Sequence, residues 1–140
     1  MNYNESLAYL DSLGKFGIKL GMERIEALLK ELDNPQDKFK SVHVTGTNGK
    51  GSVSSMIANI LLAGNLKTGK FISPHLVKYN ERISINNNDI TDEAFALVIS
   101  AVKQAADSIV AKGVCELADA ERALLFAANV LLALVGCGHF

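Results

Sequence analysis

Residues 45–52, Thr-Gly-Thr-Asn-Gly-Lys-Gly-Ser, constrain the fold most, because they lie between an expected strand and an expected helix. Residues 40–44 have the β-branched composition of a short strand, and the apolar spacing over residues 53–62 is typical of a helix. A glycine-rich turn at such a junction leaves main-chain N–H groups free to surround an anion. The pattern therefore predicts a phosphate-binding loop over residues 45–52, called the phosphate loop below, in an α/β fold.

The side chains of this loop suit a nucleotide. Lys50 supplies a point charge for phosphate oxygens, and the hydroxyl of Ser52 suits a phosphate-bound magnesium ion. The general P-loop pattern also has a glycine five residues before Gly49, where this chain has Val44, so the match is incomplete. The residues expected to bind ATP are Thr47, Asn48, Gly49, Lys50, Gly51, Ser52 and Val53, with Lys50 as the catalytic residue.

Helical spacing recurs elsewhere along the chain. It predicts helices over residues 4–13, ended by Gly14, and over residues 22–32, stopped by Asn34-Pro35. A capped helix is expected from Thr91 to about Ala111, with the buried stripe Phe95, Val98, Ile99, Val102 and Ile109. A last helix is expected over residues 119–135, whose apolar part is too short to span a bilayer.

Strands are expected around these helices. Residues 70–72 follow the phosphate-loop helix, so that strands 40–44 and 70–72 would form a βαβ unit in a mostly parallel sheet flanked by helices. Residues 82–85 and Ile90 flank an asparagine-rich turn and predict a hairpin. His43 is expected to be a hydrogen-bonded core histidine, whereas Lys67 and Lys70 are expected to be solvated.

Composition narrows the class of protein. The 140 residues are 49% hydrophobic and 21% charged with a net charge of −1, which fits one soluble domain without the basic surface of a nucleic-acid-binding protein. Cys115 and Cys137 lie far apart in the sequence and form no paired motif, so reduced thiols and a cytoplasmic location are expected. No membrane-spanning segment is expected.

Three segments together resemble the folylpolyglutamate and dihydrofolate synthases of the Mur ligase superfamily. They are Phe-Gly-Ile-Lys-Leu-Gly-Met-Glu-Arg-Ile at residues 16–25, Gly-Thr-Asn-Gly-Lys-Gly-Ser at 46–52 and Ile-Ser-Pro-His-Leu-Val-Lys-Tyr-Asn-Glu-Arg-Ile at 72–83. The resemblance covers roughly residues 3–112. It implies that residues 1–140 are the N-terminal ATP-binding domain, truncated and without the smaller C-terminal domain.

The resemblance also implies a reaction and further site residues. An ATP-dependent ligase would join L-glutamate to a folate or dihydropteroate carboxylate through an acyl phosphate, as a monomer using Mg²⁺. Ser73 would join Ser52 at the metal, and residues 74–82 would form a loop that shapes the substrate site. The tentative substrate residues are Ile18, Lys19, Leu20, His75 and Glu121.

Some alternatives stay open. The segment comparable to the family's Thr-x-Phe-Glu retains only Glu121, and the family's Glu-Val-Gly-Leu-Gly-Gly strand is missing. Glu81 and Arg82 either stabilise the loop or form a solvated pair. A non-catalytic nucleotide-binding module is the alternative from another class. A muramyl-peptide-type ligase is a rival enzyme, but those ligases generally carry Gly-Thr-x-Gly-Lys-Thr and lack Ser-Pro-His-Leu.

Overall fold

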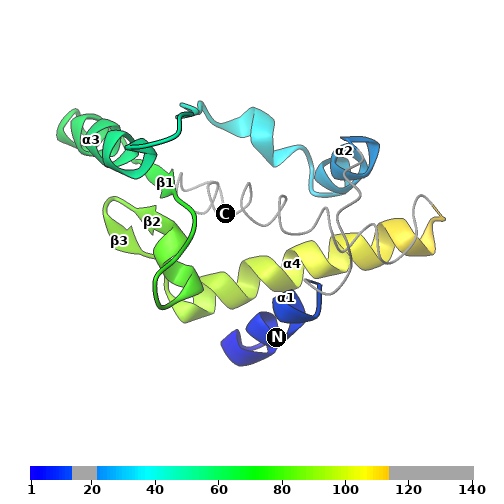
Figure 1. Cartoon of the computed structure of the whole chain (residues 1–140). Coiled ribbons are helices and arrows are strands. Elements are labelled where there is room, and N and C mark those ends of the chain that lie inside the picture. The colour runs from blue at the N-terminus through cyan, green and yellow to red at the C-terminus, as the bar shows by residue number, and fades with distance from the viewer. Residues whose placement is uncertain (14–21, 114–140) are drawn as a thin grey trace.

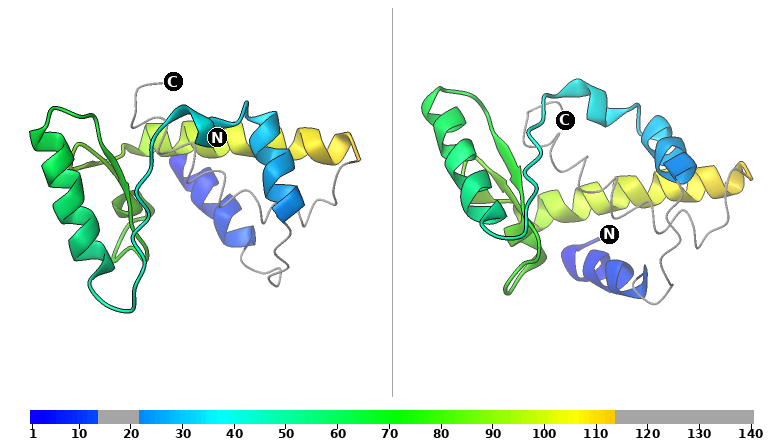
Figure 2. Two further views of the ribbon diagram at one scale, coloured as in Figure 1. Left: turned by 90° about the horizontal axis from the view of Figure 1, so that it is seen from above. Right: turned by 45° about the horizontal axis from the view of Figure 1, so that its top comes forward.

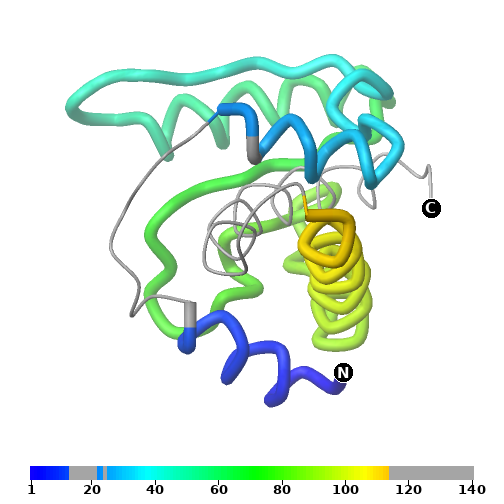
Figure 3. Tube along the Cα trace, turned by 90° about the vertical axis from the view of Figure 1, so that its right-hand side faces the viewer, coloured from blue at the N-terminus to red at the C-terminus, as the bar shows by residue number. Residues whose placement is uncertain are grey.

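The computed structural model describes residues 1–13 and 22–113, arranged around one long helix, α4 (Asp92–Ala111) (Figure 1). Helices α1 (Tyr3–Leu13) and α2 (Met22–Glu31) pack on different sides of α4, as the view along α4 in Figure 3 also shows. A short 3₁₀ helix, η1 (Pro35–Lys38), follows α2 and leads toward the phosphate loop. The chain thus separates a helical half from a half that contains the sheet.

Local signals explain α4. Thr91 is its N-cap, with the side-chain oxygen accepting the N–H of Ala94 at 3.2 Å. All members of the expected stripe are buried: Phe95, Val98, Ile99, Val102 and Ile109. By length and composition alone α4 could cross a membrane, but this stripe packs in the protein core with Leu10 and Leu28. The predicted helix is confirmed.

The end of α2 is fixed by backbone geometry and by an ion pair. Asp33 and Asn34 both have positive φ, and Pro35 then begins η1, so the predicted stop at Asn34-Pro35 is confirmed. The carboxylate of Glu31 accepts hydrogen bonds from Lys112 Nζ and Ser108 Oγ at 2.7 Å. These contacts hold the pKa of Glu31 below its usual value and join the end of α2 to that of α4.

The described sheet has three strands in the order β1 (Gly69–Phe71), β2 (Ile83–Ile85) and β3 (Asn88–Asp89). Both pairings are antiparallel, with Lys70 opposite Ser84. Asn86 and Asn87 have φ of 49° and 65°, which a two-residue type I′ hairpin turn requires. The asparagine-rich hairpin is therefore confirmed.

The other strand predictions need correction. Residues 40–44 form no strand, Val42 is 66% exposed, and His43 is exposed rather than part of the core. A β-branched run becomes a strand only with a partner for its backbone hydrogen bonds, and no described strand pairs with it. The expected βαβ unit and parallel sheet are consequently absent from the described residues, where β1 pairs only with the antiparallel β2.

Helix α3 (Lys50–Ala63) lies along the sheet (Figure 2). It ends as predicted at Gly64, whose N–H donates to Ile60 O at 3.1 Å, and at Asn65 with φ of 58°. The short connection over residues 64–68 reverses the chain into β1, so the carboxyl end of β1 returns toward the amino end of α3.

Candidate phosphate-binding site

The amino end of α3 exposes unpaired backbone donors. Its first internal hydrogen bond runs from Val53 N–H to Gly49 O at 2.9 Å, so the N–H groups of Lys50, Gly51 and Ser52 have no acceptor within the helix. Gly49 is the N-cap without a side-chain cap, and no acidic residue lies in the first turn. The helix dipole adds partial positive charge at this end. The arrangement suits an anion.

The conformation of the loop requires glycine at positions 46 and 49. Gly46 has φ of 151° and Gly49 has φ of 75°, both in the region that L side chains rarely adopt. A Cβ built on Gly49 or Gly51 would meet no described atom within 4 Å. The backbone there faces open space, so a ligand can approach the N–H groups closely.

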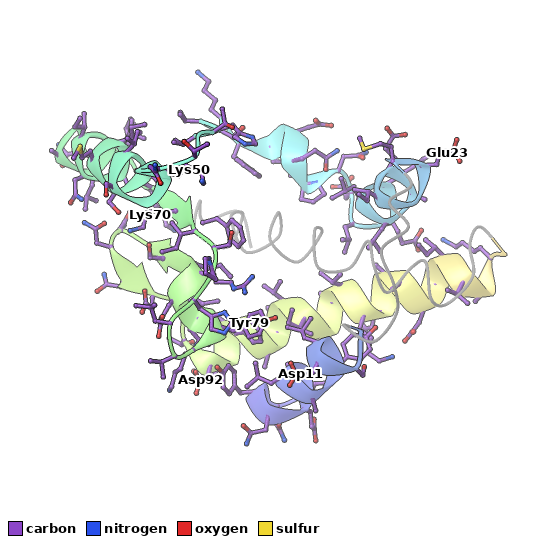
Figure 4. The ribbon with its side chains drawn as sticks, in the orientation of Figure 1. Asp11, Glu23, Lys50, Lys70, Tyr79 and Asp92 are labelled. Atoms are coloured by element: carbon purple, nitrogen blue, oxygen red, sulfur yellow. The ribbon has the colours of Figure 1, made fainter. Side chains whose placement is uncertain are left out.

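Lys50 places its charge over the same loop (Figure 4). Its Nζ donates to Gly46 O at 2.5 Å and lies 3.4 Å from Thr47 O. The ammonium is thus held against the backbone carbonyls of the loop that precedes α3. The cation and the free N–H groups therefore belong to the same loop–helix junction.

Lys70 aligns β1 with α3. Its Nζ donates to Ser55 Oγ at 3.2 Å, and the side chain is half-buried rather than solvated as expected (Figure 4). From Lys70 to Ser73 an extended chain advances about 10 Å, and from Ser55 back to Gly49 a helix spans about 9 Å. The chain runs along β1 in the direction opposite to its course along α3. Counted from the Lys70–Ser55 contact, Ser73 therefore lies about as far along the α3 axis as Gly49 does.

Residues 79–82 contact the residues that directly follow Ser73 and Pro74. Arg82 donates from Nε to His75 Nδ1 at 2.8 Å, and its guanidinium carbon lies 4.7 Å from the Tyr79 ring centroid. The His75 and Tyr79 rings are 4.5 Å apart (Tyr79 in Figure 4). Glu81 accepts three backbone N–H groups, from Leu76, Val77 and Lys78. His75 therefore helps to shape the loop.

A magnesium ion would have few protein ligands here. Within the described residues no three His, Cys, Asp or Glu side chains come together to hold a metal. Ser52, in the first turn of α3, and Ser73, just after β1, both carry exposed hydroxyl groups. Since Mg²⁺ keeps several waters and takes one or two protein oxygens beside substrate phosphates, these hydroxyls fit such an ion.

Four tentative substrate residues, Ile18, Lys19, Leu20 and Glu121, lie outside the described residues, as do Gly14 and the helix expected over 119–135. Sequence reasoning missed the Lys70 contact and left the role of Glu81 open. For Glu81 there was a signal: it stands three residues after Lys78, the spacing at which a glutamate reaches back to a cap N–H. Lys70 offered no comparable signal.

A separate groove of 740 Å³ lies between α1 and the start of α4, lined by Met1, Tyr3, Asp92 (labelled in Figure 4), Leu97 and Ser100 among others. The amino terminus donates to Ser100 Oγ there at 3.0 Å. No residue of the phosphate loop lines it. The groove is therefore distinct from the candidate site.

Comparison with known proteins identifies the relatives. A folylpolyglutamate synthase of Lacticaseibacillus casei is 39% identical over 109 residues, which are 78% of this chain and 26% of that protein. A dihydrofolate synthase/folylpolyglutamate synthase of Bacillus subtilis is 36% identical over 101 residues, 72% of this chain and 24% of that protein. This chain is homologous to part of the folylpolyglutamate and dihydrofolate synthases.

A solved folylpolyglutamate synthase has the same fold over this region. That structure, a complex with AMPPCP and folate, superposes with a TM-score of 0.80 at 34% identity, covering 93% of this chain and 32% of that one. No protein-family model matches the chain. The chain thus spans about a quarter of the length of these curated synthase relatives, and the α/β fold class is shared with them.

Proposed function

We propose that this chain is the phosphate-binding part of an ATP-dependent ligase that joins L-glutamate to a folate or dihydropteroate carboxylate. The observation that carries the proposal is the uncapped amino end of α3, with free N–H groups and Lys50 beside them. The relatives are named for this activity, and one was solved with an ATP analogue and folate. We further propose that residues 1–140 belong to the N-terminal ATP-binding domain of a cytoplasmic monomer.

The residues have separate roles in this proposal. The N–H groups of residues 50–52 and the Lys50 ammonium bind phosphate oxygens and stabilise the charge that develops on them as the phosphoryl group moves to the substrate carboxylate, giving an acyl phosphate. Ser52 and Ser73 would hold a magnesium ion, which supplies further charge neutralisation when bound. His75 shapes the loop beside the acceptor.

Two other functions are weaker. A non-catalytic nucleotide-binding module would use the same loop. That function does not account for the contacts of Glu81 and Arg82 that hold the segment after Ser73. A muramyl-peptide-type ligase fits less well, because the extra glycine at position 51 and the Ser-Pro-His-Leu segment at 73–76 both match the folate branch.

The test compares two lysines in a calorimetric titration with Mg-ATP. Lys50→Ala should weaken binding about ten- to hundredfold, the effect of losing a charged hydrogen bond worth roughly 1.5–3 kcal/mol. Lys67→Ala is the matched control, since Lys67 is exposed and lies outside the loop, and it should bind as the wild type does. Equal affinities for the two variants would refute the assignment of the site.

A further inference from the structure

One carboxylate holds the backbone of the segment that follows Ser73 and Pro74. Glu81 Oε2 accepts the N–H of Leu76 at 2.8 Å, while Oε1 accepts those of Val77 at 3.1 Å and Lys78 at 2.9 Å. In return, the N–H of Glu81 donates to Lys78 O at 3.1 Å. Three consecutive backbone donors therefore converge on a single side chain.

Burial does not hold this segment. Leu76 is 93% exposed and Val77 is 83% exposed, so neither contributes apolar packing to its own placement. The ionised form of Glu81 is the one that the N–H groups bind: the N–H of Leu76, followed by that of Lys78, holds the pKa of the carboxyl below its ordinary value. These contacts persist as the pH falls, until it passes through that lowered pKa.

The base of the loop is closed by the neighbouring residue. Ile72 N–H donates to Arg82 O at 2.8 Å, directly after β1 and directly before Ser73. Arg82 also holds His75 through Nε. Ser73 thus lies between a backbone fixed to Arg82 and a backbone fixed to Glu81, and its placement depends on both.

We propose that Glu81 is a positioning residue: by ordering residues 76–78 it fixes where Ser73 presents its hydroxyl to nucleotide-bound magnesium. This inference rests on the function proposed above. Glu81 itself touches no ligand in this arrangement. It acts on the metal-dependent part of nucleotide binding, whereas Lys50 and the α3 N–H groups act on the phosphates with or without the metal.

The experiment therefore compares nucleotide binding with and without magnesium. Affinity for a non-hydrolysable ATP analogue is measured by calorimetry with magnesium and with excess chelator, for the wild type, Glu81→Gln and Glu93→Gln. Glu93 is the matched control, because it is exposed, lies at the start of α4, and also has its pKa lowered by a backbone N–H. Amide resonances of residues 76–78 are followed by NMR.

We expect Glu81→Gln to shift these amide resonances and to weaken magnesium-dependent binding about tenfold, as changes to residues that orient metal ligands do. Its affinity in chelator should equal that of the wild type. Glu93→Gln should match the wild type in both buffers. Glu81→Asp keeps the charge on a shorter side chain, so its affinity in magnesium should lie between those of the wild type and Glu81→Gln. This variant replaces Glu81→Gln in the experiment if Glu81→Gln does not fold.

Three outcomes would overturn the positioning role. In the first, the amides of residues 76–78 shift while affinity in magnesium stays unchanged. In the second, Glu81→Gln or Glu81→Asp loses equal affinity in magnesium and in chelator, which indicates general disruption. In the third, wild-type protein binds no nucleotide in either buffer, which refutes the proposed function and the positioning role together; the first two leave the proposed function standing.

Discussion

At the scale of single residues, Ser73 offers the sharpest test of the metal assignment. It is exposed, follows β1 directly after Ile72, and lies near the level of the phosphate loop through the Lys70–Ser55 contact. Ser73→Ala removes only the hydroxyl, so nucleotide binding should weaken at low magnesium and recover as magnesium is raised, with little change in the free energy of unfolding. Calorimetry across a magnesium series measures this.

The matched control for that series is Ser54→Ala, which removes a hydroxyl from a half-buried position on α3. It should show the magnesium dependence of the wild type. If Ser73→Ala and the wild type instead bind nucleotide equally at every magnesium concentration, Ser73 is only a turn residue.

Residue identities could be read from the sequence better than residue environments. Gly46 and Gly49 were predicted correctly as turn residues, because positive φ values such as the 75° of Gly49 depend on local sterics. Gly51 was expected in the same turn but lies in the first turn of α3, which begins at Lys50 rather than at residue 53. His43 was predicted to lie in a core and is exposed, because its burial depended on a strand that did not form. Of the contacts that Glu81 makes, only the one to the N–H of Lys78 follows from the sequence spacing, while those to Leu76 and Val77 depend on the path of the loop, which the spacing does not specify.

At the scale of elements, α4 organises the helical half through one aromatic side chain. Phe95 is 1% exposed and meets the Tyr3 ring of α1 edge-on at 5.4 Å and the Tyr79 ring at 6.1 Å. Phe95→Ala should lower the free energy of unfolding by about 3–5 kcal/mol. Leu97→Ala, on the same helix but 57% exposed, should change it by less than about 0.5 kcal/mol.

Urea unfolding followed by circular dichroism measures both values. Similar losses for Phe95→Ala and Leu97→Ala would show that the buried stripe does not hold α4 in place. The comparison is well matched, because both substitutions truncate a large apolar side chain to the same residue within one helix.

Elements with strong local signals could be predicted and those that need distant partners could not. The cap at Thr91, the periodic stripe of α4 and the asparagines of the hairpin turn each act within a few residues, and all three are confirmed. Sheet direction depends on which strands meet. β1 was predicted at almost the right residues but with a parallel partner, whereas its described partner is antiparallel.

At the scale of the whole molecule, we expect the 140-residue polypeptide to bind nucleotide without ligating glutamate. Ligation requires ATP, a carboxylate and an amine in fixed geometry, and such ordering accounts for roughly 7–11 kcal/mol of a barrier. This chain spans about a quarter of its curated relatives, 26% and 24%. The assay combines it with Mg-ATP, L-glutamate and dihydropteroate or tetrahydrofolate and detects product by mass spectrometry.

A full-length homologue is the positive control for that assay. Product formed at a comparable rate, and abolished by Lys50→Ala, would show that the 140 residues are sufficient for catalysis. It would also contradict the proposal that they are only part of the ATP-binding domain of a larger enzyme.

The thin packing of α3 has a consequence for how the protein fluctuates. Ala58 is its only buried residue in the described structure, while Val53, Met56 and Ile60 are exposed on the helix. An element with so few buried contacts unfolds locally at a lower free energy than the core, so its amide hydrogens exchange with solvent before those of α4. At the site proposed here, a phosphate at the amino end of α3 would bind only the folded form of this helix. Part of the binding free energy would then be spent on suppressing the local unfolding of α3, so we expect nucleotide affinity and the protection of the α3 amides to rise or fall together.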